Sequence, residues 1–198
     1  MKVSDFVTEF LLGKGIHKCF SVTGGFAMHL NDSFGQGMDV TYTHGEQPAG
    51  YAALGWSSYE HTPSVCCVTS GCGATNAITP CLIAYQDSVP VFFISGQVHH
   101  KDNIRNHDGK IRGYFGSDCD IIESVKSITK YAVELTEPLD TLRVLQECYH
   151  NLTTGRPGPV WLSIPVDVQS MQIPKILTNY TVPNNISCTS FSKEFETL

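Results

Sequence analysis

The residues best suited to catalysis or ligand binding lie in two short glycine-containing segments. The first, "HGEQ" at 44–47, places Glu46 directly before a run of small helix-forming residues. The second, "SGCGATN" at 70–76, places two glycines after an apolar segment. A carboxylate at a helix start can hold or move a proton, and a glycine turn lets a ligand approach the backbone closely. Both segments are therefore candidate parts of a ligand site.

Each segment also has an ordinary interpretation. A glutamate in the first turn of a helix is favoured by the helix dipole, and no second carboxylate lies near Glu46 in sequence to make an acid/base pair. The turn at 70–76 fits a tight strand-to-helix connection equally well. Asn76 stands where a dinucleotide-binding pattern requires another glycine, so NAD is disfavoured. His99 and His100 lie in a polar segment that is typical of a solvated loop, and we expect no metal site.

Helical and short apolar segments alternate along the chain. Apolar strands that alternate with helices predict a three-layer α/β/α fold with a mostly parallel central sheet. Glycines at strand ends place the functional loops at the carboxyl edge of this sheet. The first helix is expected to begin with Ser4 as its N-cap. The expected helices are 4–15, 26–34, 46–59, 74–88, a short one near 119–125, and 138–155. The expected strands are 17–22, 38–43, 64–70, 90–96, one within 127–135, and 158–165.

Composition excludes several classes of function. A formal net charge of -6 without a run of basic residues argues against nucleic-acid binding. No apolar stretch is long enough to span a bilayer, and the N-terminal segment lacks the features of a signal peptide. The eight cysteines show no CxxC or zinc spacing, which favours free buried thiols and a cytoplasmic location. The helix–strand pattern fades after Pro165.

Several motifs together carry a resemblance to a known family. The segments "VTGGFAMHLNDSF", "HGEQPAGYAALGW", "VTSGCGATNAITPCLIAYQDSVPVFFISGQV", "ESVKSITKYA" and "TTGRPGPVWLSIPVDVQ" occur in this order. In order and spacing they resemble the N-terminal, pyrimidine-binding domain of thiamine-diphosphate enzymes of the acetolactate synthase type. The resemblance covers residues 1–173 and implies one such domain. Residues 174–198 are expected to form an extended tail or the start of a linker.

The resemblance implies roles for particular residues. The glutamate at the position of Glu46 hydrogen-bonds the N1′ atom of the cofactor's aminopyrimidine in that family and helps to activate thiamine diphosphate. The segments that match the cofactor side and the substrate side of the site also come from the resemblance. They assign cofactor binding to Thr23, Gly24, Gly25, Glu46, Gly71, Gly73 and Asn76, and the substrate side to Phe26 and Gln97.

The chain also departs from the family pattern. The family holds the diphosphate and Mg²⁺ through a Gly-Asp-Gly motif in a separate domain, and no such motif occurs in these residues. Mg²⁺ is therefore expected only with a partner domain. Other departures stand around the candidate site and put substrate choice in doubt: Gly45, Leu54, Cys72, Pro80, Gly116 and Ser117.

Two functional interpretations follow, and a third is weaker. The chain is either the pyrimidine-binding half of an enzyme for carboligation or decarboxylation of a 2-oxo acid, or a non-catalytic remnant that acts as an interaction or regulatory domain. A flavodoxin-like binding protein would follow only if the motif agreement were chance. The resemblance implies a homodimer or higher oligomer, and a separate diphosphate-binding domain or subunit as a further partner. Neither nucleic acid nor a membrane is expected as a partner.

Overall fold

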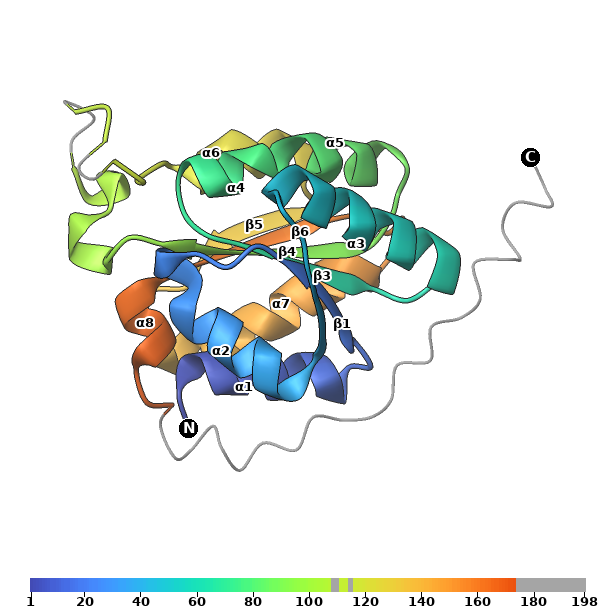
Figure 1. Cartoon of the computed structure of the whole chain (residues 1–198), viewed down its shortest axis with the longest axis horizontal. Coiled ribbons are helices and arrows are strands. Elements are labelled where there is room, and N and C mark those ends of the chain that lie inside the picture. Colours follow the sequence, from blue (N-terminus) through green and yellow to red (C-terminus); the bar gives the residue numbers. More distant parts are fainter. Residues whose placement is uncertain (108–110, 114–115, 174–198) are drawn as a thin grey trace.

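A computed structural model of the chain describes residues 1–107, 111–113 and 116–173. Six strands alternate with helices along this part of the chain (Figure 1). The strands are β1 (Lys18–Ser21), β2 (Asp39–Tyr42), β3 (Ser64–Val68), β4 (Val91–Gln97), β5 (Tyr131–Glu134) and β6 (Val160–Pro165). The helices are α1 (Val3–Gly13), α2 (Met28–Gly37), α3 (Glu46–Glu60), α4 (Cys72–Asn76), α5 (Ile78–Gln86), α6 (Ile121–Val125), α7 (Thr141–Thr153) and α8 (Val166–Ser170).

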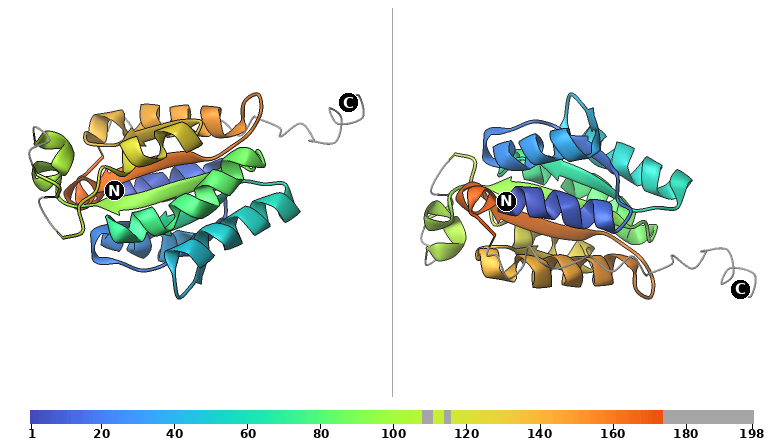
Figure 2. Two further views of the ribbon diagram at one scale, coloured as in Figure 1. Left: turned by 90° about the horizontal axis from the view of Figure 1, so that it is seen from above. Right: turned by 90° about the horizontal axis from the view of Figure 1, so that it is seen from below.

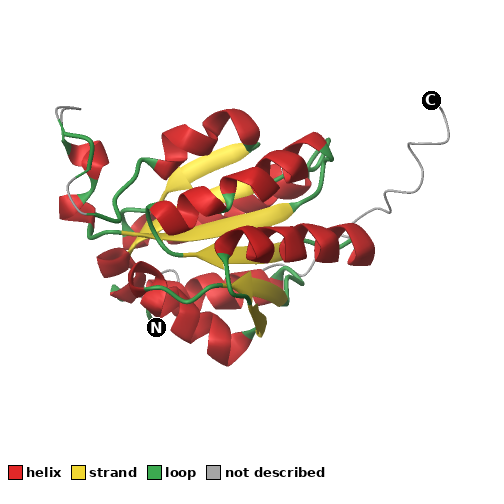
Figure 3. Cartoon of the chain, turned by 45° about the horizontal axis from the view of Figure 1, so that its top comes forward, coloured by secondary structure: helices red, strands yellow, loops and turns green. Residues whose placement is uncertain are grey.

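All six strands form one parallel sheet in the order β2-β1-β3-β4-β6-β5. Helices cover both faces, so the molecule has three layers (Figure 2; Figure 3). The expected α/β/α fold is therefore confirmed. The chain passes from β1 outward to β2 and then returns to the other side of β1 to form β3. This reversal makes a topological switch point, where open α/β sheets bind ligands at the carboxyl ends of their strands.

The two sheet faces build two separate cores. Alternate residues of each strand point to opposite faces, as Cys66 and Cys67 of β3 show. Helices α1, α2, α7 and α8 pack on one face, whereas α3, α4, α5 and α6 pack on the other. Trp161 is fully buried in the second core, where its ring stacks on Phe93 and its indole N–H donates to Ser95 Oγ. The helices that carry the candidate site are thus fixed on one apolar face.

Two local predictions were wrong. Helix α1 begins at Val3, and Ser4 is buried inside its first turn, where its hydroxyl accepts a hydrogen bond from Ser33 Oγ at 2.9 Å. The helix expected at 74–88 is two helices, because Pro80 has no N–H to donate to the carbonyl of Asn76 four residues earlier. Helix α4 ends at that asparagine and α5 begins two residues later.

Two further expectations concern the chain as a whole. The expected tail, residues 174–198, lies outside the described residues. Within the described ranges, no helix combines the length and the apolar character that a membrane crossing requires.

Candidate functional site

The carboxyl ends of the first three strands bring three loops together. The loops follow Ser21 of β1, Tyr42 of β2 and Val68 of β3, and these strands are neighbours in the sheet. The Thr43 amide donates to Ser21 O at 2.9 Å, which ties the first two loops at their bases. The switch point therefore gathers the segments at 22–26, 43–47 and 69–76, which sequence reasoning had selected separately.

Glu46 is the first residue of α3, and its side chain turns toward the loop after β3. Its Oε2 atom accepts a hydrogen bond from Asn76 Nδ2 at 3.0 Å. Among the described residues, no donor reaches the other carboxylate oxygen, Oε1. An open pocket of about 290 Å³ lies here, and its lining residues are Gly45, Glu46, Gln47, Pro48, Thr75, Asn76 and Thr79. The carboxylate is thus held by one oxygen and can accept a ligand hydrogen bond with the other.

Gly73 allows the α4 turn to approach this carboxylate. A Cβ atom at Gly73 would lie 2.6 Å from Thr69 Cγ2 and 3.3 Å from Glu46 Oε1. Any side chain there would crowd both neighbours. The absent side chain therefore keeps the backbone of α4 beside the Glu46 carboxylate, as the glycine turn in the sequence suggested.

Thr69 links the loop after β1 to the loop after β3. A Cβ atom at Gly24 would lie 2.4 Å from Thr69 Cβ, so the two loops touch directly. The Thr69 hydroxyl is buried and has no hydrogen-bond partner among the described residues. A buried hydroxyl without a partner is costly, and this one lies between two candidate cofactor-binding glycines. Thr69 was missed in the sequence, where its position next to "SGCG" was the available signal.

The other residues of the loop after β1 lie around this contact. Thr23 and Gly25 are exposed, and Phe26 is half-buried. The Phe26 carbonyl accepts a hydrogen bond from Gln169 Nε2 at 2.8 Å, which attaches the loop to α8. The loop therefore has a fixed backbone and presents accessible residues at the carboxyl edge.

Gln97 has a structural role in the described residues. It is 1% exposed, its Nε2 donates to Cys119 O at 2.8 Å, and its Oε1 accepts from the Val98 amide at 2.9 Å. Both polar ends are thus engaged inside the protein. Gly71 contacts residues 116–120, the segment by which the chain returns to the sheet before α6 (the returning segment). Gly71 has φ +58°, and a Cβ atom there would lie 2.4 Å from Ser117 O. Together these contacts hold the returning segment against the carboxyl edge of the sheet.

Residues 100–105, which follow β4, are held against β5 and α8. Asn103 is fully buried and donates from Nδ2 to both carboxylate oxygens of Glu134, at 2.8 and 2.9 Å. Burial raises the pKa of Glu134, although the hydrogen bonds from Asn103 and the charge of Arg105 oppose the shift. The His100 amide donates to Asp167 Oδ1 at 3.0 Å. His100 therefore lies in a packed segment, unlike the solvated loop that we expected.

The predicted site residues divide into two groups. Glu46 and Asn76 line one pocket, Gly73 lies beside the Glu46 carboxylate, and Gly24 and Gly71 shape the neighbouring loops. Gln97 lies beneath the returning segment rather than in the pocket. Four pocket residues were not selected from the sequence, because they carry no reactive group and follow the motif residues by one or a few positions: Gln47, Pro48, Thr75 and Thr79. No group of three metal-ligating side chains occurs within the described part of the chain.

Comparisons with known proteins agree with this geometry. The family described as "Thiamine pyrophosphate enzyme, N-terminal TPP binding domain" matches residues 1–124. The chain is 36% identical over 160 residues to the acetolactate synthase large subunit of Corynebacterium glutamicum, covering 78% of this chain and 24% of that protein. It is 32% identical over 194 residues to acetolactate synthase 1, chloroplastic, of Oryza sativa subsp. japonica, covering 94% and 28%. It therefore spans about a quarter of the length of these relatives.

The family match includes the loops that build the pocket. Residues 1–124 contain β1 to β4 and helices α1 to α5, and hence Glu46, Gly73 and Asn76. The match to acetolactate synthases continues through most of the remaining chain. The chain belongs to the family of thiamine pyrophosphate enzyme N-terminal TPP-binding domains and is of the acetolactate synthase-like type.

Proposed function

We propose that this chain supplies the pyrimidine-binding half of a thiamine-diphosphate site, with Glu46 as the group that contacts the cofactor. The observation that carries the proposal is the geometry of this carboxylate. One oxygen is held by Asn76 at 3.0 Å, and the other has no donor among the described residues and faces Gly73. A pyrimidine ring nitrogen that shares a proton with Glu46 would complete its hydrogen bonding.

The residues around Glu46 fit an aminopyrimidine. Gly73 places no side chain of its own between α4 and the Glu46 carboxylate, and the buried Thr69 hydroxyl nearby has no hydrogen-bond partner among the described residues. Thiamine diphosphate, when bound, supplies a nucleophilic carbon for carboligation or decarboxylation of 2-oxo acids. The residues of this chain would orient its pyrimidine ring, and Glu46 would hold a proton at the ring nitrogen.

A complete site requires a second surface. Glu46 is only half-buried and its pocket is open, so its carboxylate stays hydrated until another surface covers it. The described residues contain no cluster that could hold Mg²⁺, and the sequence has no Gly-Asp-Gly motif. We therefore assign the diphosphate and Mg²⁺ to a further domain, in a longer chain or in a separate subunit.

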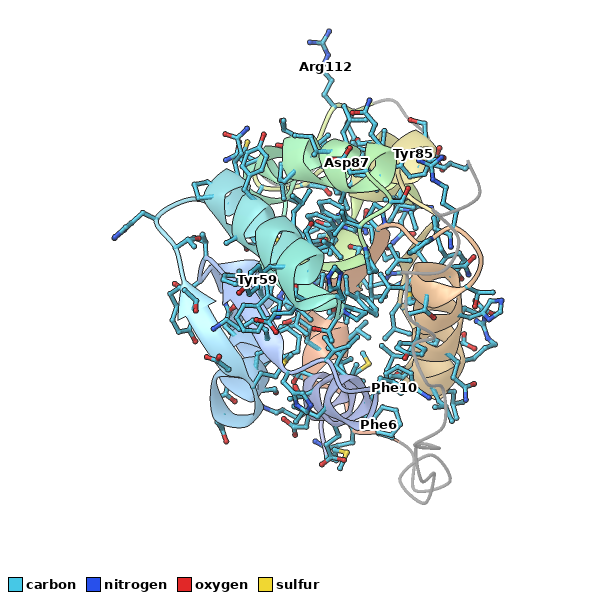
Figure 4. All side chains as sticks on the ribbon, turned by 90° about the vertical axis from the view of Figure 1, so that its right-hand side faces the viewer. Phe6, Phe10, Tyr59, Tyr85, Asp87 and Arg112 are labelled. Atoms are coloured by element: carbon cyan, nitrogen blue, oxygen red, sulfur yellow. The ribbon has the colours of Figure 1, made fainter. Side chains whose placement is uncertain are left out.

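We also propose that the chain pairs with a second copy through α3 and α5. These neighbouring helices expose large apolar side chains: Tyr51 (39%), Tyr59 (82%), Leu82 (37%) and Tyr85 (41%). Tyr59 and Tyr85 lie on the same side of the molecule in Figure 4. Exposed apolar surface of this kind is typical of an interface between proteins.

Sedimentation velocity at micromolar chain concentration tests this pairing. We expect a dimer for the parent and a monomer for Leu82→Glu. Leu139→Glu is the matched control, because Leu139 is 65% exposed and lies outside both helices, in the 3-10 turn Pro138–Asp140 that precedes α7. A monomeric parent, or a Leu82→Glu variant that stays dimeric, would contradict the proposal.

The described cysteines support a reducing compartment such as the cytoplasm. All seven are free, and five of them are buried: Cys19, Cys66, Cys67, Cys81 and Cys148. Burial raises the pKa of these five thiols, which keeps them protonated and unreactive. This arrangement is typical of proteins whose thiols stay reduced.

The pyrimidine contact can be tested by NMR titration of the full chain with thiamine, which lacks the diphosphate. We expect shifts of backbone amides at 45–47 and 75–79, the segments that contain the residues lining the pocket. In Glu46→Gln the affinity should fall about tenfold, because a hydrogen bond to a charged group is lost. Asp39→Asn, which changes an exposed carboxylate at the start of β2, is the matched control and should leave binding unchanged.

The same titration separates the two interpretations of the chain. Shifts that are confined to the pocket, and that need about tenfold more thiamine in Glu46→Gln, support the half-site. Absence of binding, or shifts at the β5 and β6 edge, would overturn it and favour a non-catalytic interaction domain.

A further inference from the structure

Two described thiols differ from the other five in their accessibility. Cys72 is exposed and Cys119 is half-buried, whereas the remaining described cysteines are buried. Thiol exchange requires an accessible sulfur. The structure thus leaves one pair of thiols for reaction, and neither has a role in the proposed pyrimidine contact.

Both cysteines stand at the start of helices on the same face of the sheet. Cys72 opens α4, and Cys119 precedes α6 by two residues. Ala74 of α4 and Ile121 of α6 belong to the same buried cluster. Helices α4 and α6 accordingly lie near each other above the sheet in Figure 1.

Two contacts fix how the segments 71–81 and 117–128 are aligned. Near their first residues, a Cβ atom at Gly71 would lie 2.4 Å from Ser117 O. Near their last residues, Cys81 Sγ donates to Ile128 O at 3.7 Å. Cys81 follows Cys72 by nine residues, and Ile128 follows Cys119 by nine residues. The two segments therefore run side by side in the same direction, with Cys72 and Cys119 at the same level.

The electrostatic environment is consistent with this proximity. Burial raises the pKa of the Cys119 thiol, a hydrogen bond with Ser124 opposes this shift, and the charges of Asp120, Asp118 and an ionised Cys72 add to it. Cys72 is thus within electrostatic range of Cys119. The exposed thiol is suited to attack an external disulfide, and the half-buried thiol is suited to resolve the product.

We propose that Cys72 and Cys119 form a reversible disulfide by exchange with a small disulfide such as glutathione disulfide. Cys72 loses its proton and its sulfur attacks one glutathione sulfur, so that the first glutathione thiol leaves. Cys119 then loses its proton and attacks Cys72 Sγ, and the second glutathione thiol leaves. The two protein thiols are oxidised by two electrons in total, and glutathione disulfide is reduced to two thiols.

The bond would join α4 to the segment that returns to the sheet before α6. Helix α4 contains Gly73 and Asn76, which lie against Glu46. Gln97 already holds the Cys119 carbonyl at 2.8 Å from beneath. The disulfide would therefore restrain one wall of the Glu46 pocket, in a way that does not depend on which ligand the pocket takes.

The test uses the full chain with Cys188→Ser, which removes the thiol outside the described residues from competition. The chain is incubated with glutathione disulfide, its remaining thiols are alkylated, and peptides are mapped by mass spectrometry without reduction. We expect a peptide that links Cys72 to Cys119 within one chain, its loss on reduction, and an upward shift of the thermal unfolding midpoint while it is present. A disulfide requires a distance of about 4.4–6.8 Å between the Cα atoms of its two cysteines.

Single substitutions distinguish the steps. Cys119→Ser should accumulate a mixed disulfide of glutathione with Cys72, because the resolving thiol is gone. Cys72→Ser should leave Cys119 largely unmodified, and Cys148→Ala, which removes a buried thiol, should leave the linked peptide in place. A parent chain that stops at glutathione on Cys72, or that links Cys72 only between chains, would overturn the proposal.

Discussion

Replacing Gly73 by alanine tests whether the α4 turn must lie against Glu46. The added Cβ would lie 2.6 Å from Thr69 Cγ2, which is too close, and 3.3 Å from Glu46 Oε1. Thr69 has little room to yield, because it also contacts Gly24 and a β-branched side chain has few rotamers. Overpacking of this kind costs about 1–3 kcal/mol, and alanine returns about 1 kcal/mol through its helix propensity. We expect a net loss of about 1 kcal/mol.

Gly55→Ala is the matched control for this substitution. Gly55 lies inside α3, is exposed, and has nothing within 4 Å of an added Cβ. It should gain about 0.5–1 kcal/mol. Urea unfolding followed by far-UV circular dichroism, at one chain concentration, should separate the two variants by about 1 M in midpoint. If Gly73→Ala is as stable as Gly55→Ala, the close packing that we describe around Glu46 is wrong.

Three other predictions use the same chain. Thr69→Val removes a buried hydroxyl that has no partner among the described residues, so the free energy of unfolding should stay the same or rise by up to about 1 kcal/mol. Thiamine binding measured by NMR should weaken in this variant. A lower free energy of unfolding would indicate a partner for this hydroxyl. Burial raises the folded-state pKa of Glu134 above its unfolded value of about 4.3, so its favourable contribution is complete below that pH and is lost as pH rises through the folded pKa. The free energy of unfolding of the parent minus that of Glu134→Gln should therefore fall as pH rises from about 4 to 7, and a flat difference would contradict this. Glu46→Gln should keep the stability of the parent to within about 0.5 kcal/mol in urea unfolding, because the side chain is only half-buried, and a larger loss would assign it a structural role.

The sheet could be predicted from sequence because its signals are local. Strands such as β3 and β4 are apolar throughout, and glycines or prolines mark their ends. The start of α1 and the break between α4 and α5 were harder to predict from the sequence. Ser4 is a good N-cap residue by type, yet tertiary packing buries it against Ser33. Pro80 signals a break only when the exact helix register is known.

The site could be predicted in part for the same reason. Glu46 and Gly73 belong to motifs, and parallel strands bring their loops to one edge. The bond from Asn76 to Glu46 joins residues that are 30 positions apart, and no local pattern contains it. Thr69 and the Asn103–Glu134 contact likewise depend on loops that meet only in the folded chain. The assignment of Gln97 failed to anticipate its burial, because its two hydrogen bonds depend on the path of the returning loop.

We propose that this chain recognises the pyrimidine of thiamine diphosphate and leaves the diphosphate to another domain. Calorimetric titration of the parent and of Glu46→Gln with thiamine, and with thiamine diphosphate plus Mg²⁺, tests it most directly. We predict weak binding of equal affinity for both ligands in the parent, and an affinity about tenfold lower for both in Glu46→Gln. Much tighter binding of thiamine diphosphate with Mg²⁺ would contradict the account, because the chain would then hold a diphosphate site of its own.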